Sequence, residues 1–202
     1  MFRKAGQKLV GEGRYGKVYE SPIPGRVIKT MDDPHMMVDE ANMQRAAAQL
    51  GLAPAVTESG MNDSGIPFIE MRDLRDNFER HGEKARGFPK GMDAVRVNQQ
   101  LGQLALNDIA LKDRHNNNVF YNKMTGRPTQ IDFGISQRVE GADKVQALTN
   151  ATTDGFEAAG IPEMGDILRG IVYDYLEGGQ VDEAMDVAKQ GFSRLQKIKH
   201  PL

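Results

Sequence analysis

The sequence predicts an α+β fold, with a β-rich first third that carries one helix and a mainly helical remainder that carries a small hairpin. Three observations lead to this prediction. Alternating apolar residues with Gly and Pro punctuation occur near the N-terminus, apolar residues at helical spacing dominate after Gly91, and two short β-like segments follow the first helix of that region. A hinge is expected near Arg72–Asp76, so residues 1–74 and 75–202 are predicted to form two lobes of one domain.

The first third is expected to form a sheet with one helix. Alternating apolar residues bounded by turn residues predict strands over Lys8–Val10, Lys17–Glu20, Arg26–Thr30, Val56–Glu58 and Pro67–Leu74. A segment rich in Ala, Met, Gln and Glu predicts a helix over Met37–Leu50 that ends at Gly51. The charged, Gly-bearing segment 75–91 is expected to be a loop.

The remainder is expected to be mainly helical. A helix is predicted over Asp93–Ile109, and short strands are predicted over Val119–Tyr121 and Thr129–Asp132. Two amphipathic helices are predicted to close the chain. Their apolar stripes are Met164, Ile167, Leu168, Ile171, Val172 and Tyr175, then Val181, Ala184, Met185, Ala188, Phe192 and Leu195.

Composition excludes several classes of protein. Hydrophobic residues make up 39% and charged residues 27%, as in ordinary folded chains. The 26 basic and 28 acidic residues leave a net charge of −2, so no basic surplus indicates nucleic acid or an anionic membrane as a partner. The absence of cysteine excludes disulfides, thiolate zinc and a cysteine nucleophile. No membrane span and no ordinary signal peptide are expected, because no apolar run approaches about 18 residues and the N-terminus has no apolar core.

A glycine-rich segment, Gly11-Glu12-Gly13-Arg14-Tyr15-Gly16-Lys17-Val18, lies between two predicted strands. A dinucleotide-binding fingerprint and a P-loop would both need a helix after the glycines, and a P-loop also needs a hydroxyl where Val18 stands. The remaining interpretation is a glycine-rich hairpin that covers phosphates. A plain hairpin turn is the alternative.

Further motifs follow this segment in a definite order. They are Arg26-Val27-Ile28-Lys29, Glu40 in the predicted helix, Leu111-Lys112-Asp113-Arg114-His115-Asn116-Asn117-Asn118, and Asp132-Phe133-Gly134. Over roughly residues 8–135 the chain therefore resembles the protein-kinase-like superfamily. The resemblance implies a bilobal fold, with a small antiparallel-sheet N-lobe plus one helix (1–74) and a truncated, mainly helical C-lobe (75–202).

The resemblance implies that the cofactors are ATP and Mg²⁺, with Mn²⁺ as an alternative. Lys29 would hold the α- and β-phosphates and be held by Glu40, with Asp39 as a rival partner. Asp113 would orient the attacking hydroxyl and accept its proton. Asn118 and Asp132 would supply the hard oxygen ligands that Mg²⁺ prefers.

The resemblance also implies a nucleotide site. Adenine would lie between Val18 and Val27 on one side and Phe120 on the other, with Met71 at the back and the backbone of Arg72–Leu74 along its edge. The full set of expected nucleotide contacts is Gly11, Gly13, Gly16, Val18, Val27, Lys29, Met71 and Phe120.

Two departures from the family pattern affect the expected function. Lys112 stands where protein kinases usually have an arginine, which argues against activation by loop phosphorylation. The run Asp113-Arg114-His115-Asn116 is similar to phosphatidylinositol kinases, and its Asp-x-His-x-x-Asn spacing is similar to aminoglycoside and choline kinases. His115 either stabilises the transferred phosphoryl group or is an ordinary loop histidine.

The short region after the last motif favours a minimal kinase of the kind found among secreted bacterial effectors and phage proteins, since 68 residues follow Gly134. The expected function is a serine/threonine protein kinase, located in a bacterial or phage-infected cytoplasm or delivered into a host cell. A protein substrate and an activating protein partner are the expected partners. The alternatives are a small-molecule or lipid kinase, a pseudokinase that acts through contacts, and nucleotidyl transfer on the same fold.

Overall fold

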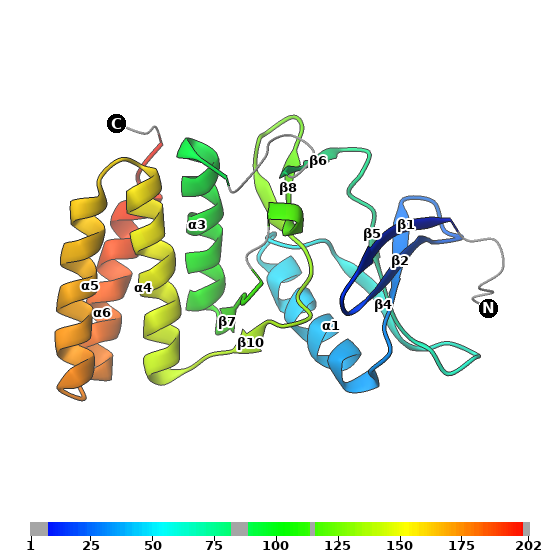
Figure 1. The fold of residues 1–202 in the computed structure, drawn as a ribbon, viewed down its shortest axis with the longest axis horizontal. Helices are drawn as coiled ribbons and strands as arrows, with labels where there is room; N and C mark the ends of the chain where they lie inside the picture. The colour runs from blue at the N-terminus through cyan, green and yellow to red at the C-terminus, as the bar shows by residue number, and fades with distance from the viewer. Residues whose placement is uncertain (1–7, 82–88, 114–115, 200–202) are drawn as a thin grey trace. The chain divides into compact units, whose positions relative to one another are not determined.

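The structure, a computed structural model, describes residues 8–81, 89–113 and 116–199 (Figure 1). The chain forms two compact units. The first comprises the described residues of Met1–Arg80 and Asn117–Ser136, and the second those of His81–Asn116 and Gln137–Leu202. Sheets and helices both contribute to the architecture, so the predicted α+β class is confirmed.

The first unit is built on a five-stranded antiparallel sheet. In order across the sheet, its strands are β1 (Leu9–Gly13), β2 (Gly16–Glu20), β3 (Arg26–Thr30), β5 (Pro67–Arg72) and β4 (Val56–Met61). Helix α1 (Pro34–Gln49) connects β3 to β4 and packs against β4 and β5.

One face of this sheet contributes to an apolar core with α1. The buried members of this core are Val27, Met31, Met37, Ala41, Ile69 and Met71. Lys29 lies two residues after Val27 on the same face of β3 and directly opposite Ile69 of β5. Its aliphatic stem is therefore buried among apolar side chains, and its ammonium group needs polar partners within the unit.

The same sheet contains a second buried charge. Glu70, opposite Ile28 and 1% exposed, accepts hydrogen bonds from Ser21 Oγ at 2.6 Å, Arg26 Nη1 at 2.8 Å and Thr57 Oγ1 at 2.9 Å. Burial alone would raise the pKa of the Glu70 carboxyl, but these three donors lower its pKa below the ordinary value. The carboxylate thus links β5 to β3, β4 and the end of β2.

A three-stranded antiparallel sheet completes the first unit. Its order is β6 (Phe78–Arg80), β8 (Val119–Asn122) and β9 (Pro128–Gln130), and the 3₁₀ turn η1 (Asn116–Asn118) leads into β8. Gln130 N donates to Leu52 O at 2.9 Å, which joins β9 to the segment that follows α1.

The described part of the second unit contains four helices and a short ribbon. The helices are α3 (Gly91–Leu106), α4 (Gly141–Ala158), α5 (Pro162–Glu177) and α6 (Val181–Gln196), and β7 (Ile109–Ala110) pairs antiparallel with β10 (Gln137–Arg138). Helix α4 packs against the other three helices, and Figure 1 shows it between α3 and α5. None of the described helices is long and apolar enough to cross a lipid bilayer.

The apolar stripes in the sequence did not predict α4 as a separate helix. The sequence predicts helix in this region, but it defines only two closing stripes, whereas three helices follow β10. Three threonines occupy buried positions of α4. Thr149 Oγ1 and Thr152 Oγ1 donate to Val145 O and Leu148 O, both at 2.8 Å, which satisfies the hydroxyls inside the core. These threonines interrupt the apolar stripe of α4, whose other buried residues are Val145, Leu148, Ala151, Gly155 and Phe156.

Several predicted boundaries are wrong. Helix α1 begins at Pro34 rather than Met37, because the Asp33 side chain caps it by accepting from His35 N at 2.8 Å. Helix α3 ends at Leu106 rather than at residue 109, since the backbone turns at residue 108 and the chain enters β7. The segment expected as a loop, 75–91, contains strand β6.

We expect Gly102→Ala to destabilise the protein because Gly102 of α3 contacts α6 closely. A Cβ atom at this position would lie 2.2 Å from Cε2 of Phe192, whose ring is buried. Overpacking should lower the free energy of unfolding by about 1–3 kcal/mol, although Ala is intrinsically the better helix former by about 1 kcal/mol. Urea unfolding followed by circular dichroism measures the change.

The matched control is Gly170→Ala in α5, where no atom lies within 4 Å of a built Cβ. Replacing this exposed helical glycine with alanine should raise the free energy of unfolding of the protein by about 0.5–1 kcal/mol. Equal effects of the two substitutions would contradict the close packing of α3 on α6.

We expect Glu70 to stabilise the first unit in a pH-dependent way. Because its folded-state pKa is lowered, the stabilisation should be present above the ordinary value of 4.5 and lost as the pH falls through the folded-state pKa. Glu70→Gln should therefore cost about 1.5–3 kcal/mol at neutral pH and progressively less below pH 4.5. Urea titrations between neutral and acidic pH test this, with the exposed Glu58→Gln as control. A constant difference from the wild type would contradict it.

Candidate active site

The glycines of the glycine-rich segment lie in a β-hairpin. Strands β1 and β2 pair Gly13 with Gly16 across the turn Arg14–Tyr15. A Cβ atom on Gly16 would lie 2.2 Å from the backbone carbonyl oxygen of Thr30 in β3, so this close approach requires glycine. Strand β3 rather than a helix follows the hairpin, which excludes the dinucleotide-fingerprint and P-loop interpretations.

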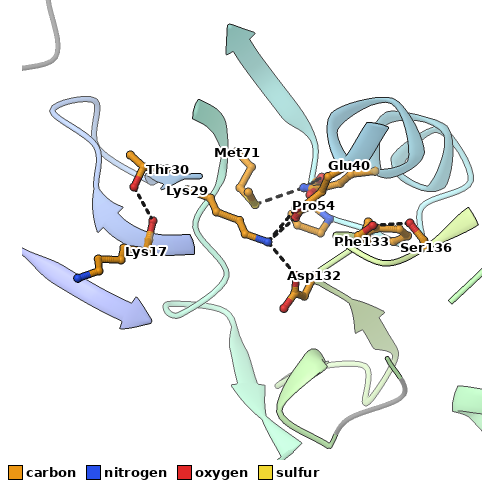
Figure 2. Close-up of polar contacts among 10 residues, drawn as sticks. Lys17, Lys29, Thr30, Glu40, Pro54, Met71, Asp132, Phe133 and Ser136 are labelled. Carbon is orange, nitrogen blue, oxygen red and sulfur yellow. Dashed lines mark hydrogen bonds and ion pairs between the residues drawn. The ribbon is translucent and has the colours of Figure 1, made fainter. Parts of the chain in front are cut away.

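The ammonium group of Lys29 is bound by two carboxylates, as Figure 2 shows. Its Nζ lies 2.7 Å and 2.8 Å from the two carboxylate oxygens of Glu40, and 2.8 Å from Oδ1 of Asp132. Glu40 comes from α1 and Asp132 follows β9, so one ammonium group joins β3 to both. The choice between Asp39 and Glu40, which the sequence left open, falls on Glu40, because Asp39 is exposed.

Burial and charge act in opposite directions in this cluster. Burial alone would lower the pKa of Lys29, but the carboxylates of Glu40 and Asp132 raise it above its ordinary value, so the ammonium stays charged. Burial raises the pKa of the Glu40 carboxyl, and the Lys29 ammonium opposes that effect. Asp132 is the most accessible member of the cluster, with a side chain 34% exposed against 1% for Glu40.

The backbone around Asp132 has an unusual conformation. Asp132 has φ 62°, a left-handed value that costs a non-glycine residue on the order of 1–3 kcal/mol. Two residues later, a Cβ atom on Gly134 would lie 3.1 Å from Oε2 of Glu40 and 3.4 Å from Oδ1 of Asp132. The left-handed turn and the missing side chain together give the Asp132 carboxylate room beside Lys29 and Glu40.

Asn118 and Asp132 lie on adjacent segments of the same unit. Ile131 N donates to Asn118 O at 2.9 Å, just beyond the β8–β9 pairing, and Asn118 is buried. Within the described ranges, no three His, Cys, Asp or Glu side chains gather as a metal site. Mg²⁺, however, keeps several waters and commonly uses one or two protein ligands together with phosphate oxygens. The Asp132 carboxylate, which uses one oxygen for Lys29, and the Asn118 amide fit that donor set.

The residues expected around adenine belong to the first unit. Val18 lies directly opposite Lys29 in the β2–β3 pair, and Val27 lies opposite Met71 in the β3–β5 pair. Met71 is buried, and its Sδ accepts a hydrogen bond from Gln44 Nε2 at 3.3 Å (Figure 2). Gln44 thereby fixes the residue expected at the back of the pocket.

Two further residues of the expected nucleotide site, Phe120 and Gly11, also belong to the first unit. Phe120 is half-buried in β8. A Cβ atom on Gly11 would lie 3.8 Å from Cβ of Val18, so this position tolerates a side chain better than Gly16 does.

The structure does not test the roles of two expected catalytic residues. Asp113 belongs to the second unit, where it is half-buried and follows β7. His115 lies outside the described residues. The structure thus brings Lys29, Glu40 and Asp132 into direct contact, and the roles of Asp113 and His115 stay predictions.

Arg80 is a residue of this region that the sequence did not indicate. Its Nε donates to Asn117 O at 2.7 Å, and its guanidinium lies 5.6 Å from the centroid of the Phe120 ring, within cation–π range. Arg80 therefore contacts both the end of the expected catalytic loop and the expected floor of the adenine site. It occurs in a charged segment without apolar alternation, so nothing in the sequence distinguishes it from a surface arginine.

We expect Gly16→Ala to destabilise the sheet that carries Lys29. The added methyl group would meet a backbone carbonyl of β3, so β2 and β3 would have to separate, at a cost of about 1–3 kcal/mol. Thermal unfolding measures the loss. Gly13→Ala is the matched control in the same hairpin, because no atom lies within 4 Å of a Cβ there. It should change stability by less than about 0.5 kcal/mol, and an equal loss in both variants would refute the close approach.

The sequence matches no protein-family model and no curated protein. Among solved structures, the kinase PK-1 of Cydia pomonella granulovirus is similar with a TM-score of 0.52 and 14% identity, over 75% of this chain and 70% of that one. Vaccinia related kinase 3 is similar with a TM-score of 0.51 and 14% identity, over 68% of this chain and 51% of that one. The PknI kinase domain of Mycobacterium tuberculosis has 20% identity and a TM-score of 0.49, over 78% of this chain and 76% of that one.

The likenesses to PK-1 and to vaccinia related kinase 3 extend over two thirds or more of this chain. At 14% identity, they show the arrangement of the backbone and not the activity. Together with the element order, they confirm the fold that the order of the motifs predicted. The chain has the protein-kinase-like fold.

Proposed function

We propose that the chain is an ATP- and Mg²⁺-dependent phosphotransferase that transfers the γ-phosphoryl group to serine or threonine hydroxyls of a protein. The contact of Lys29 with Glu40 and Asp132 carries this proposal. Stability alone does not explain three charged groups at a buried position, because well-packed apolar residues usually stabilise a buried site as well or better. A left-handed aspartate in the same cluster adds strain, and strain of this kind gathers at functional sites.

Lys29 supplies the positive charge for the α- and β-phosphates in this proposal. Glu40 keeps the ammonium in place through two hydrogen bonds, while the third donor, now used by Asp132, turns to the phosphate. Asp132 and Asn118 would hold Mg²⁺, which when bound neutralises charge on the phosphate oxygens. The Asp132 carboxylate, the most exposed group of the cluster, gives a cation direct access to an oxygen ligand.

Transfer itself needs a base at the acceptor hydroxyl, and we assign that role to Asp113. The hydroxyl oxygen forms a bond to the γ-phosphorus as the bond from that phosphorus to the β–γ bridging oxygen breaks. The hydroxyl proton passes to the Asp113 carboxylate, and ADP leaves with the bridging oxygen. Positioning and charge neutralisation account for most of the catalysis in this class of reaction.

The nucleotide base is assigned to Val18, Val27, Met71 and Phe120, with the backbone that follows β5 along its edge. Arg72 N already donates to Ala55 O at 3.1 Å, and Asp73 N donates to Gly25 O at 2.9 Å. Leu74 is therefore the residue of this segment whose N–H we assign to the adenine edge.

We expect Asp132→Asn to abolish transfer of labelled γ-phosphate from Mg²⁺–ATP. The chain is incubated by itself and with a protein lysate, and label on protein is measured. Loss of the metal-binding carboxylate should lower the rate by about 10²-fold or more. Asp63→Asn, the same change at an exposed turn of the same unit, is the control and should keep the wild-type rate.

The outcomes separate the alternatives. Label on protein that disappears in Asp132→Asn but persists in Asp63→Asn supports the proposal. Label that passes only to a soluble acceptor identifies a small-molecule kinase. Label carried over from α-labelled ATP identifies nucleotidyl transfer. ATP binding without turnover identifies a binding module, and an unchanged rate in Asp132→Asn refutes the site.

A further inference from the structure

The apolar stripe of α5 is wider than the surface that its neighbours cover. The sequence stripe comprises Met164, Ile167, Leu168, Ile171, Val172 and Tyr175. Leu168 and Val172 are buried against α4 and α6, whereas Ile167 is 64% exposed and Ile171 is 42% exposed. Single exposed apolar residues are ordinary, but these two are adjacent on one helix face and extend the buried stripe outward.

Acidic residues line the exposed side of the same helix. Helix α5 contains Glu163, Asp166, Asp174 and Glu177 against one arginine, Arg169, for a net charge of −3. The whole chain has a net charge of only −2, so negative charge is concentrated on this element. All four acidic residues are exposed, and Glu163 and Asp174 are one helical turn from Ile167 and Ile171 respectively.

The centre of this face also allows a partner to approach closely. Gly170 lies in the turn between Ile167 and Ile171, and no atom lies within 4 Å of a Cβ built on it. Ile167 and Ile171, four residues apart, form a ridge with a notch beside it, which is the shape that accepts side chains of a crossing helix. We refer to Glu163, Asp166, Ile167, Gly170, Ile171 and Asp174 as the α5 face.

From these observations we infer that the α5 face docks a basic amphipathic helix of a partner protein. Such a helix would place apolar side chains on Ile167 and Ile171 and lysine or arginine beside Asp166 and Asp174. Charge decides among the occupants. A second copy docked through the same face would bring two negative surfaces together, and an anionic membrane would be repelled. The inference is independent of the proposed function.

The test uses the full chain and three labelled 14-residue peptides. The first is helical, with leucines on one face and lysines beside them; the second has glutamate in place of lysine; the third is a scrambled sequence of the first composition. Fluorescence anisotropy in about 150 mM salt, where long-range charge effects are screened, measures the affinities. We expect the basic helical peptide to bind at least about 10-fold more tightly than either of the others.

Variants then locate the binding site. Ile167→Ser with Ile171→Ser removes the apolar ridge, and Asp166→Lys with Asp174→Lys reverses the adjacent charge without touching buried residues. Each pair should weaken binding of the basic peptide by about 10-fold or more. The matched control is Glu157→Lys with Asp186→Lys, the same charge change at exposed positions of α4 and α6. It should keep the affinity within about twofold.

Four results would overturn the inference. They are equal binding of the scrambled or acidic peptide, an equal loss in the control pair, the absence of binding at millimolar peptide, and self-association of the wild type that Ile167→Ser with Ile171→Ser abolishes. The last result would assign the α5 face to a second copy of the chain. Circular dichroism of each variant ensures that a loss of binding is not a loss of folding.

Discussion

The first unit depends on the burial of one ammonium group between two carboxylates. The stem of Lys29 lies in the apolar row of β3, so its charge can be accommodated only if carboxylates from elsewhere reach it. Glu40 does so from α1 and Asp132 from the segment after β9. Losing either partner would leave a buried charge poorly compensated, which is far more costly than the net gain from making the pair. The position of α1 on the sheet and the path of the chain through Asp132 are therefore coupled.

Backbone constraints around this cluster are local and strict. Gly16 lies against the carbonyl oxygen of Thr30, Gly134 leaves space beside two carboxylates, and Asp132 adopts a left-handed conformation. These features occur where the expected phosphate and metal ligands lie. The accessible Asp132 carboxylate favours a cation, and the charged Lys29 beside it favours an anion. That combination suits a metal–nucleotide complex better than either ion alone.

Two neighbouring helices of the second unit differ in how far other helices cover them. Helix α4 packs against three neighbours and fills its core face partly with threonines whose hydroxyls bond to its own backbone. Helix α5, by contrast, packs against α4 and α6 and retains an apolar ridge beside acidic side chains. Helix α4 is therefore enclosed by its neighbours, whereas helix α5 remains partly exposed. This difference between neighbouring helices is what makes the α5 face a surface for a partner rather than an unfinished core.

The sequence by itself determined the α+β class, most of the elements and the residues from which the cluster is drawn, because spacing along the chain and residue chemistry are local properties. The separation of eleven positions between Lys29 and Glu40 and the Asp132-Phe133-Gly134 run are visible without a structure. Only the tertiary structure decided that Glu40 rather than its neighbour Asp39 reaches the lysine, since adjacent helical residues point about 100° apart and only packing selects between them. The contact of Arg80 with Phe120 joins two strands that are distant in the sequence, so the pattern of residues along the chain could not predict it. For α5, periodicity identified the apolar residues, but the outer half of the stripe stayed exposed because no described helix lies close enough to cover it.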